Sequence, residues 1–370
     1  MKKKGLLFIC VAMLMVFGVF IYGCDAPPPE EPAEPAEVEE PAEVVETPDE
    51  DFETIHLDFA GLMPPESPFE QFVMPVYLEE IEKATDGRVE ITTYPGGTLI
   101  AGGDIFDGVA RGTADMGHES LSWVEGRLPV SDIFKKSGHP LENSKAASRT
   151  FAETVEILDL EEYHDVKVLM LFCTGPGHIH STVPIRSLED LQGLEIRCIG
   201  GDAPAVEALG ASPITMNHAE AYEALERGVV QGTLASNETL IAWHMAEVTD
   251  YTTLTPFLYN GLQAILMNLD TWNSLPPDIQ DGIEEASEKV WEEHVIGFFD
   301  EQSERGLEYA IEEHGQEVIT LSEEEQERWI EQIDHLIDDY ADELDEQGLP
   351  GTEVKELMFE LGEKYSAEYR

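Results

Sequence analysis

The sequence has few cationic residues for its length. It contains 21 Lys and Arg against 77 Asp and Glu in 370 residues, which gives a formal net charge of −56 at pH 7. A protein that binds nucleic acid needs a basic surface to neutralise phosphates, and this composition excludes one. We therefore expect no nucleic-acid partner. The length alone predicts two domains of ordinary size.

Cysteine is also scarce, with four residues in the whole sequence. They do not form a disulfide framework, because Cys10 lies in an N-terminal apolar run and Cys24 lies at its end. Cys173 and Cys198 each lie in an apolar segment that is typical of a strand. We expect two buried free thiols there, with a disulfide as the alternative.

The motifs of nucleotide-binding proteins and hydrolases are missing. The sequence has no glycine-rich loop that ends in Lys and Ser or Thr, no dinucleotide fingerprint and no nucleophile elbow. His178 and His180 lie on one face of a predicted strand, at a spacing that could bind a metal. No third ligand accompanies them, so hydrogen-bonded or exposed histidines are the favoured interpretation. We expect no metal, no cofactor and no enzymatic activity.

An apolar segment opens the sequence. Lys2, Lys3 and Lys4 precede the run "GLLFICVAMLMVFGVFIYGC", whose ending resembles a bacterial lipobox. That resemblance implies cleavage before Cys24 and a lipid on its sulfur, although Tyr22 stands where a small residue is usual. We expect residues 1–23 to be a signal peptide of the lipoprotein type. A retained membrane-anchor helix is the alternative.

Residues 24–53 read as the lipidated cysteine and an acidic tether. The 29 residues that follow Cys24 are rich in Pro and Glu, contain 13 acids and have no cation. Such a segment buries too little apolar surface to fold, and at ~3.1 Å per residue it would reach on the order of 90 Å. The remaining body carries 64 acids and 18 bases. We interpret this excess as adaptation to high salt, with a surface biased towards solubility as the alternative.

From residue 54 the pattern alternates between strands and helices, which indicates an α/β fold. Ile55, Leu57 and Phe59 alternate along the first predicted strand. The segment 262–270, "LQAILMNLD", is apolar enough for a strand buried on both faces. We expect three acidic amphipathic helices at the C-terminal end, near 278–314, 322–346 and 352–368.

Two predicted helices begin with capping signals. Ser67 precedes Glu70, and Ser187 precedes Asp190, each at the spacing of a capping box. Pro75 lies inside the first of these helices, where a proline removes a backbone hydrogen bond. We expect a kink at Pro75.

One arginine lies inside the short predicted strand "GLEIRCIGG", residues 193–201. Leu194, Ile196 and Cys198 alternate with it, so Arg197 points away from the face that these three bury. A planar guanidinium matches a carboxylate in two-pronged fashion, and such a pair is stronger in a closed cleft than on a surface. We interpret Arg197 as the anchor for a ligand carboxylate, with an ion pair inside the protein as the alternative.

The surrounding stretch supports this interpretation. Residues 184–232 resemble the solute-binding proteins of tripartite ATP-independent periplasmic (TRAP) transporters, dicarboxylate and other organic-acid receptors, in "PIRSLEDLQGLEIRCIGG", "LGASP" and "AYEALERGVVQG". The resemblance continues in other segments, which together span most of residues 55–280: "SPFEQF", "ATDGRVEITTYPGGTL", "GVARGTADMG", "TGPGHIHS" and "MNLDTWNSLP". Gln231 stands where the family usually has Asp, which affects the detail of the pocket.

The resemblance implies a two-lobe periplasmic-binding-protein-like fold with hinge strands and long C-terminal helices. It places lobe 1 at residues 54–174 and about 263–302, and lobe 2 at residues 175–262 and about 303–370. Arg197 falls on the family's arginine that pairs with the substrate carboxylate.

Further pocket candidates lie where predicted strands end. Met63 follows the first strand, and its alternative role is simple packing. Asn237 is equally placed to cap the next helix. The remaining candidates are His118, Ser120 and Ser236 as polar contacts, and Trp243 and Tyr259 as aromatic walls. We expect Trp123 to pack in the core.

These features together predict an extracytoplasmic, lipid-tethered receptor in the periplasm or at the outer face of the cytoplasmic membrane. It captures a small organic acid and delivers it to TRAP membrane permease subunits. Contacts with both lobes favour the closed form. The alternatives are a ligand-sensing co-receptor on the same fold and an enzyme. The residues leave open whether the acid is aliphatic, keto, hydroxy or aromatic, and whether the protein is a monomer or a dimer.

Overall fold

A computed structural model describes residues 54–369 of the protein except 125, 140 and 142. The predicted signal peptide and tether, including Cys24, lie outside the described residues. The strands in the described part are β1 (Ile55–Gly61), β2 (Val89–Tyr94), β3 (Met116–Ser120), β4 (Val166–Ser181), β5 (Glu195–Cys198), β6 (Ser212–Thr215), β7 (Gly232–Ser236), β8 (Tyr251–Leu254), β9 (Asn260–Asn268) and β10 (Glu317–Thr320).

Helices separate most of these strands, so the predicted α/β alternation is confirmed. They are α1 (Met74–Ala84), α2 (Ile105–Ala110), α3 (Ser144–Leu158), α4 (Leu188–Leu191), α5 (Ala203–Ala208), α6 (His218–Glu226), α7 (Thr239–Ala242), α8 (Leu269–Ser274), α9 (Pro277–Val290), α10 (Phe298–His314), α11 (Glu323–Ile333), α12 (His335–Glu346) and α13 (Gly351–Glu368). The three predicted C-terminal helices are present, but short breaks divide the first two of them.

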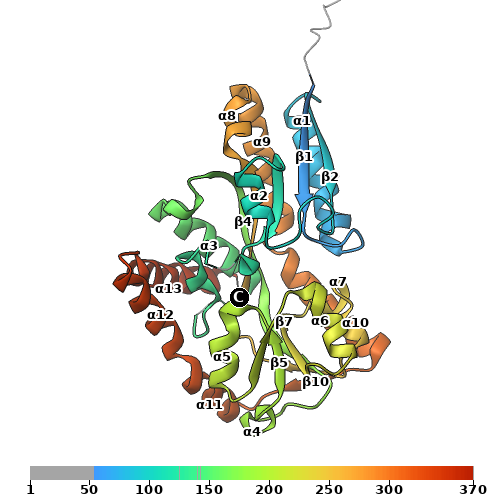
Figure 1. Cartoon of the computed structure of the whole chain (residues 1–370), viewed down its shortest axis with the longest axis vertical. Helices are drawn as coiled ribbons and strands as arrows, with labels where there is room; N and C mark the ends of the chain where they lie inside the picture. Colours follow the sequence, from blue (N-terminus) through green and yellow to red (C-terminus); the bar gives the residue numbers. More distant parts are fainter. Residues whose placement is uncertain (1–53, 125, 140, 142, 370) are drawn as a thin grey trace, which may run out of the picture. The chain divides into compact units, whose positions relative to one another are not determined.

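The strands form two groups that share β4. In the first group β1 pairs in parallel with β2 and β3, and β9 runs antiparallel to β3 and β4. In the second group the end of β4 pairs with β7 and β8, β5 pairs with β6 and β7, and β10 pairs with β8. Figure 1 shows β4 running from the first group towards β7 and β5. All nine residues of β9 are buried, as its apolar sequence predicts.

Each group of strands has its own hydrophobic core. Phe59 and Phe172 belong to the core around the first group, while Ile196 and Leu234 belong to that around the second. The predicted two-lobe α/β fold is therefore present. We call the first group and its core lobe 1, and the second group and its core lobe 2.

The C-terminal helices are divided between the lobes differently from the sequence-based assignment. Residues 303–370 were expected in lobe 2, yet Ile337, Ala341 and Met358 join the core of lobe 1, and α13 packs against α3. Trp329 of α11 does belong to lobe 2. An amphipathic pattern shows that a helix has an apolar face, but it does not identify the surface that covers this face.

The expected kink at Pro75 takes a specific form. Residues Phe69–Val73 form a turn of π-helix, and α1 begins at Met74, so Pro75 occupies one of the first two positions of α1. The Met74 N–H donates to the Phe69 carbonyl, so the π-helical turn runs directly into α1, and both π-turns and prolines are usual sites of irregularity in a helix. Only half of the predicted capping box forms: Ser67 Oγ accepts from the Glu70 N–H at 3.4 Å.

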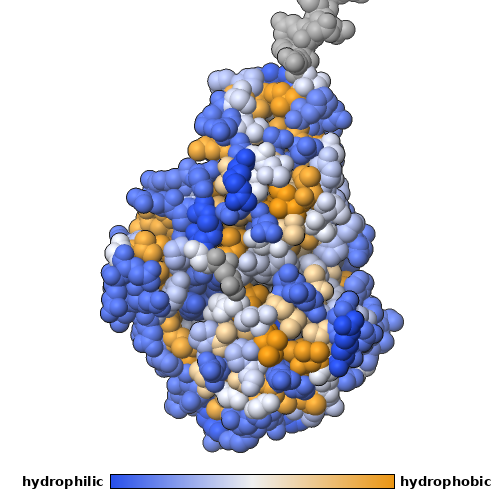
Figure 2. Space-filling view, in the orientation of Figure 1, coloured by the Kyte–Doolittle hydropathy of each residue, from blue (hydrophilic) through white to orange (hydrophobic). Residues whose placement is uncertain are grey.

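The surface is mostly hydrophilic on the face shown in Figure 2, and its apolar side chains form separate patches. The large hydrophobic residues that are exposed come from different elements and loops: Phe72, Leu99, Ile157, Val229 and Ile311. Among the described residues, no helix combines the length and the apolar composition that a membrane crossing requires.

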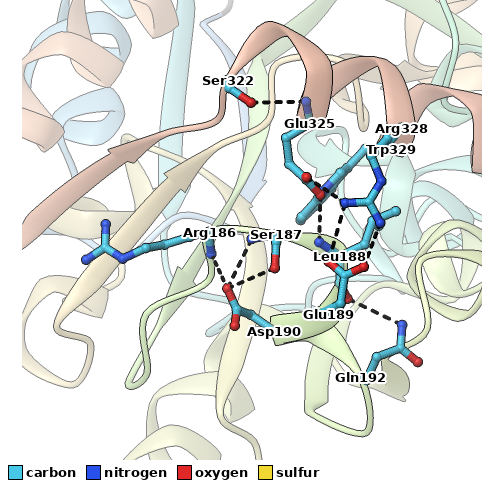
Figure 3. Close-up of polar contacts among 10 residues, drawn as sticks. All are labelled: Arg186, Ser187, Leu188, Glu189, Asp190, Gln192, Ser322, Glu325, Arg328 and Trp329. Carbon is cyan, nitrogen blue, oxygen red and sulfur yellow. Dashed lines mark hydrogen bonds and ion pairs between the residues drawn. The ribbon is translucent and has the colours of Figure 1, made fainter.

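The second predicted capping box is confirmed. Asp190 Oδ2 accepts from the backbone N–H of Ser187 at 3.1 Å, and the Ser187 side chain caps the first turn of α4 in return. Glu325 of α11 then accepts from the backbone N–H of Leu188 at 2.8 Å and from the Trp329 indole at 3.2 Å (Figure 3). These contacts hold α11 against the start of α4 and thus position the edge of lobe 2.

Candidate functional site

A cavity lies between the two lobes, beside β4, the strand that they share. Its free volume is about 40 Å³. It is lined by Leu62, Met63, Ser120, Ser122, Trp123, Thr174, Ile199, His218, Ser236, Glu238, Thr239, Trp243, Tyr259, Gly261, Gln263 and Phe299. We call it the inner cavity. Both lobes contribute to it, because Met63 follows β1 of lobe 1 and Ser236 ends β7 of lobe 2.

A larger space of about 210 Å³ adjoins the inner cavity. The two share Ser122, Trp123 and Ile199 in their walls. Gly102 and Gly103 of lobe 1 lie on one side of this outer space, and residues 215–217 of lobe 2 lie on the other. A continuous cleft therefore runs between the lobes.

Arg197 lies at the lobe 2 side of this cleft and is fully buried. Its Nε donates to the Met216 carbonyl at 2.8 Å, and its Nη1 donates to His218 Nδ1 at 3.1 Å and to the Leu234 carbonyl at 3.3 Å. Its Nη2 is buried without any hydrogen-bond partner. No carboxylate among the described residues forms an ion pair with it, so the alternative of an internal ion pair finds no support.

His218 connects Arg197 to the inner cavity. Its ring lies 5.7 Å from that of Trp243 and 6.0 Å from that of Trp123, measured between centroids. Burial and the neighbouring Arg197 hold the pKa of His218 well below its usual range. The neutral ring therefore accepts a hydrogen bond from the guanidinium through Nδ1.

Glu238 brings a carboxylate to the wall of the inner cavity. Its side chain accepts from Ser236 Oγ at 2.5 Å and from Ser303 Oγ at 3.4 Å. The residue is 6% exposed. Burial raises the pKa of Glu238 to about 7, even though the hydrogen bond from Ser236 favours the charged form.

Five of the predicted site residues line the inner cavity: Met63, Ser120, Ser236, Trp243 and Tyr259. Tyr259 is almost fully buried, and its ring packs so closely on Gly177 that a side chain there would collide with it. That glycine is part of β4, the shared strand, so the aromatic wall is fixed to the hinge region.

Three predicted residues do not line the inner cavity. Arg197 lies beside it, in contact with His218. His118 is buried behind Gln263, with Nε2 3.2 Å from Gln263 Oε1, and burial lowers the pKa of His118 to about 3. Asn237 is buried against Gly306 of α10, and Glu238, not Asn237, precedes α7 as its N-cap residue.

Several lining residues were missed from the sequence. Trp123 packs against the core of lobe 1, as expected, but it also lines the inner cavity, where its ring centroid lies 5.9 Å from that of Trp243. His218 and Glu238 were not singled out at all. Glu238 follows the predicted pair Ser236 and Asn237 directly, so the end of that strand was the available signal.

The two histidines of the possible metal site, His178 and His180, form hydrogen bonds within the protein. His178 Nδ1 accepts from the Thr255 N–H at 2.9 Å, and His180 Nδ1 lies 2.9 Å from Thr252 Oγ1. The described residues contain no cluster of three or more potential metal ligands. Cys173 and Cys198 are buried free thiols, as expected.

Comparison with known proteins identifies the fold and the family. Residues 59–343 match the model of the bacterial extracellular solute-binding proteins, family 7. The C4-dicarboxylate-binding periplasmic protein DctP of Rhodobacter capsulatus is 26% identical over 304 residues, which cover 79% of this chain and 88% of that protein.

Two solved structures extend the likeness over nearly the whole described chain. A TRAP periplasmic solute-binding protein from Desulfovibrio salexigens is 32% identical with a TM-score of 0.74, covering 85% of this chain and 98% of the other. One from Bordetella bronchiseptica, which holds (R)- and (S)-mandelate, is 25% identical with a TM-score of 0.75, covering 84% and 99%.

Proposed function

Because the chain belongs to the bacterial extracellular solute-binding proteins of family 7, a family of receptors and not of enzymes, we propose that it captures a small organic acid in the cleft between its lobes. In this proposal the closed, loaded form delivers the acid to a permease of the TRAP type. The relatives from Rhodobacter capsulatus and Bordetella bronchiseptica, which bind a C4-dicarboxylate and mandelate, support an acid as the ligand.

The observation that carries the proposal is the state of the Arg197 guanidinium. Burial of a charge without a counterion is unfavourable, and a buried N–H group without an acceptor adds to that cost. Nη2 of Arg197 has no acceptor, and no described carboxylate forms an ion pair with the guanidinium; Asp202 and Glu220 act on it only at longer range. A ligand carboxylate supplies both, in a site from which water is largely excluded.

The arrangement of the lobes explains how capture would work. The inner cavity holds about 40 Å³, room for only a few water molecules. An organic acid of ordinary size therefore enters after the lobes separate or the rings move. A ligand that touches Trp123 on lobe 1 and His218 on lobe 2 then favours closure, because it gains the second set of contacts only in the closed form.

Substitution of Arg197 tests this function. We expect wild-type protein to bind at least one acid from a calorimetric panel of dicarboxylates, keto, hydroxy and aromatic acids. Arg197→Met should weaken that binding at least about 30-fold, the usual consequence of removing one partner of a buried charge pair. Arg197→Lys, which keeps the charge but loses the planar fork, should give an intermediate affinity.

Arg186→Met is the matched control. Arg186 is an exposed arginine that pairs with Glu317 at 2.6 Å and is not part of the cavity wall. Its removal should leave affinity unchanged. Equal affinity of Arg197→Met and wild type, with circular dichroism showing both folded, would contradict the proposal.

We further propose that a lipid on Cys24 holds the receptor at the outer face of the cytoplasmic membrane. The lipobox-like "IYGC" and the acidic tether support this part of the proposal. In a bacterial host fed labelled palmitate, wild type should carry the label and sediment with membranes, and Cys24→Ala should lack the label. Wild type that carries no label and keeps residues 1–23, as shown by its intact mass, would indicate a retained anchor helix instead.

A further inference from the structure

Glu238 is the one acidic residue on the wall of the inner cavity in the described part of the chain. It lies at the end of the strand β7 and directly before α7. Its two side-chain hydrogen-bond partners, Ser236 and Ser303, are neutral hydroxyl groups, and its own backbone N–H is a third neutral donor. No described cation forms an ion pair with Glu238.

A carboxylate has room for more than these two contacts. Its two oxygens offer about four lone-pair positions, and the serines occupy one on each oxygen. The rest of the group borders the cavity. A buried carboxylate that accepts hydrogen bonds only from two hydroxyl groups and its own backbone N–H, with no cation paired to it, is poorly solvated, and its raised pKa of about 7 agrees with this geometry.

The cleft therefore contains two polar groups that lack partners, one that needs a hydrogen-bond acceptor and one that needs a donor. Arg197 offers an unused donor, Nη2, and Glu238 offers unused acceptor positions. Arg197 contacts His218, which lines the inner cavity together with Glu238, and no ion pair joins Arg197 to Glu238. An acid with a purely hydrocarbon remainder would satisfy Arg197 and leave Glu238 facing an apolar surface.

We propose that the ligand is an organic acid that also carries a hydrogen-bond donor, a hydroxyl or an ammonium group, which binds to the Glu238 carboxylate while the acid group pairs with Arg197. This inference rests on the proposed function. It narrows the substrate class to organic acids that carry either a hydroxyl or an ammonium group. The rings of Trp123 and Trp243 cover the hydrocarbon part between the two ends.

A purely structural role for Glu238 predicts something different. The contact with Ser303 joins α7 to α10, and this contact would persist whatever the ligand carries. Only a ligand-binding role makes the affinity depend on the donor. Discrimination between ligands, and not stability, is therefore the informative measurement.

The experiment compares acids that differ in one group. We would measure affinities by calorimetry at pH 8 for 3-phenylpropionate, phenyllactate and phenylalanine, and for the aliphatic set propionate, lactate and alanine. Wild type should bind a hydroxy or amino member at least about tenfold more tightly than the parent acid of its set, because loss of the donor leaves a buried acceptor unpaired. Preference for hydroxy or for amino identifies the donor.

Two variants complete the test. Glu238→Gln keeps the shape and can still bond both serines, and it should reduce the preference to within about threefold. Glu247→Gln, at an exposed acid outside the cavity wall, should keep the wild-type preference. Parent acids that bind as tightly as their substituted partners, or an unchanged preference in Glu238→Gln, would overturn this inference alone. Failure of every acid in these sets and in the wider panel to bind would overturn the proposed function as well.

Discussion

Asp202 lies at a contact between the lobes. Its carboxylate is 4% exposed and neither oxygen has a hydrogen-bond partner. The contact is formed by Lys135 and Lys136 of lobe 1 against Gly201 and Asp202 of lobe 2, and Lys136 Nζ is 3.4 Å from the Gly201 carbonyl oxygen. Burial outweighs the attraction of these cations and raises the pKa of Asp202 to about 7.

This shift makes a prediction about stability and pH. The folded pKa lies above the usual value of 3.8, so the folded protein holds a proton that the unfolded chain has lost between about pH 4 and pH 7. The free energy of unfolding therefore loses a contribution from Asp202 as pH rises through that window. Asp202→Asn removes the titration, and we expect it to match wild type at pH 4 to 5 and to exceed it at pH 8 by on the order of 2 kcal/mol.

Denaturant titrations at both pH values measure this difference. Lys135, Lys136, Arg197 and Asp132 also act on the Asp202 carboxylate, and their combined effect is already contained in its raised pKa. Asp281→Asn, at an exposed position of α9, should show no such dependence on pH. A stability deficit of Asp202→Asn that is equal at pH 5 and pH 8 would contradict the prediction.

Individual residues show what the sequence could and could not predict about the site. Arg197 could be identified from the sequence, because it is a rare cation in an alternating strand within a stretch that resembles a known family. Glu238 was not, because one acid among 77 carries no signal until the fold places it beside a cavity. The role of Trp123 on the cavity wall was missed for a related reason. The sequence around an aromatic residue does not show whether its ring packs in a core or lines a binding site.

At the scale of secondary-structure elements, patterns among neighbouring residues predicted elements correctly, whereas the packing between elements distant in the sequence was not predicted. The capping box at Ser187 and the buried strand β9 follow from neighbouring residues and are present. Pro75 marked an irregularity, but its form depends on the π-helical turn before α1. The packing of α13 on α3 depends on a surface more than 190 residues away in the chain, which no local pattern specifies.

β4 illustrates the same point for the hinge. The apolar run of residues 166–172 is only the first part of β4, which continues to Ser181 and changes partners from β9 to β7 near Gly177. Register irregularities between Cys173 and Pro176 bend the strand where it leaves lobe 1. β4 therefore belongs to both sheets and connects the two lobes through this short segment.

At the scale of the whole molecule, the excess of acids dominates the electrostatics. Outside the predicted signal peptide and tether, the chain has 64 acids and 18 bases. Many of the bases are already used in ion pairs that join distant segments, such as Lys167 with Glu284 and Arg328 with Glu189. The remaining carboxylates repel one another, and this repulsion opposes the compact state at low ionic strength.

Salt should therefore stabilise the protein. Raising NaCl shortens the Debye length from ~10 Å at 0.1 M to ~3 Å at 1 M, which screens repulsion between surface carboxylates. The same screening weakens the surface ion pairs, but these contribute little each. We expect the melting temperature to rise by about 5–10 °C between 0.1 and 3 M NaCl, as a gain of a few kcal/mol would produce in a protein of this size.

Scanning calorimetry at pH 8, with sucrose as an uncharged control for solute exclusion, measures the effect. If sucrose gives the same rise, or if the melting temperature stays flat in NaCl, charge repulsion is not what the salt relieves, and the interpretation of the acidic surface as an adaptation to high salt is wrong.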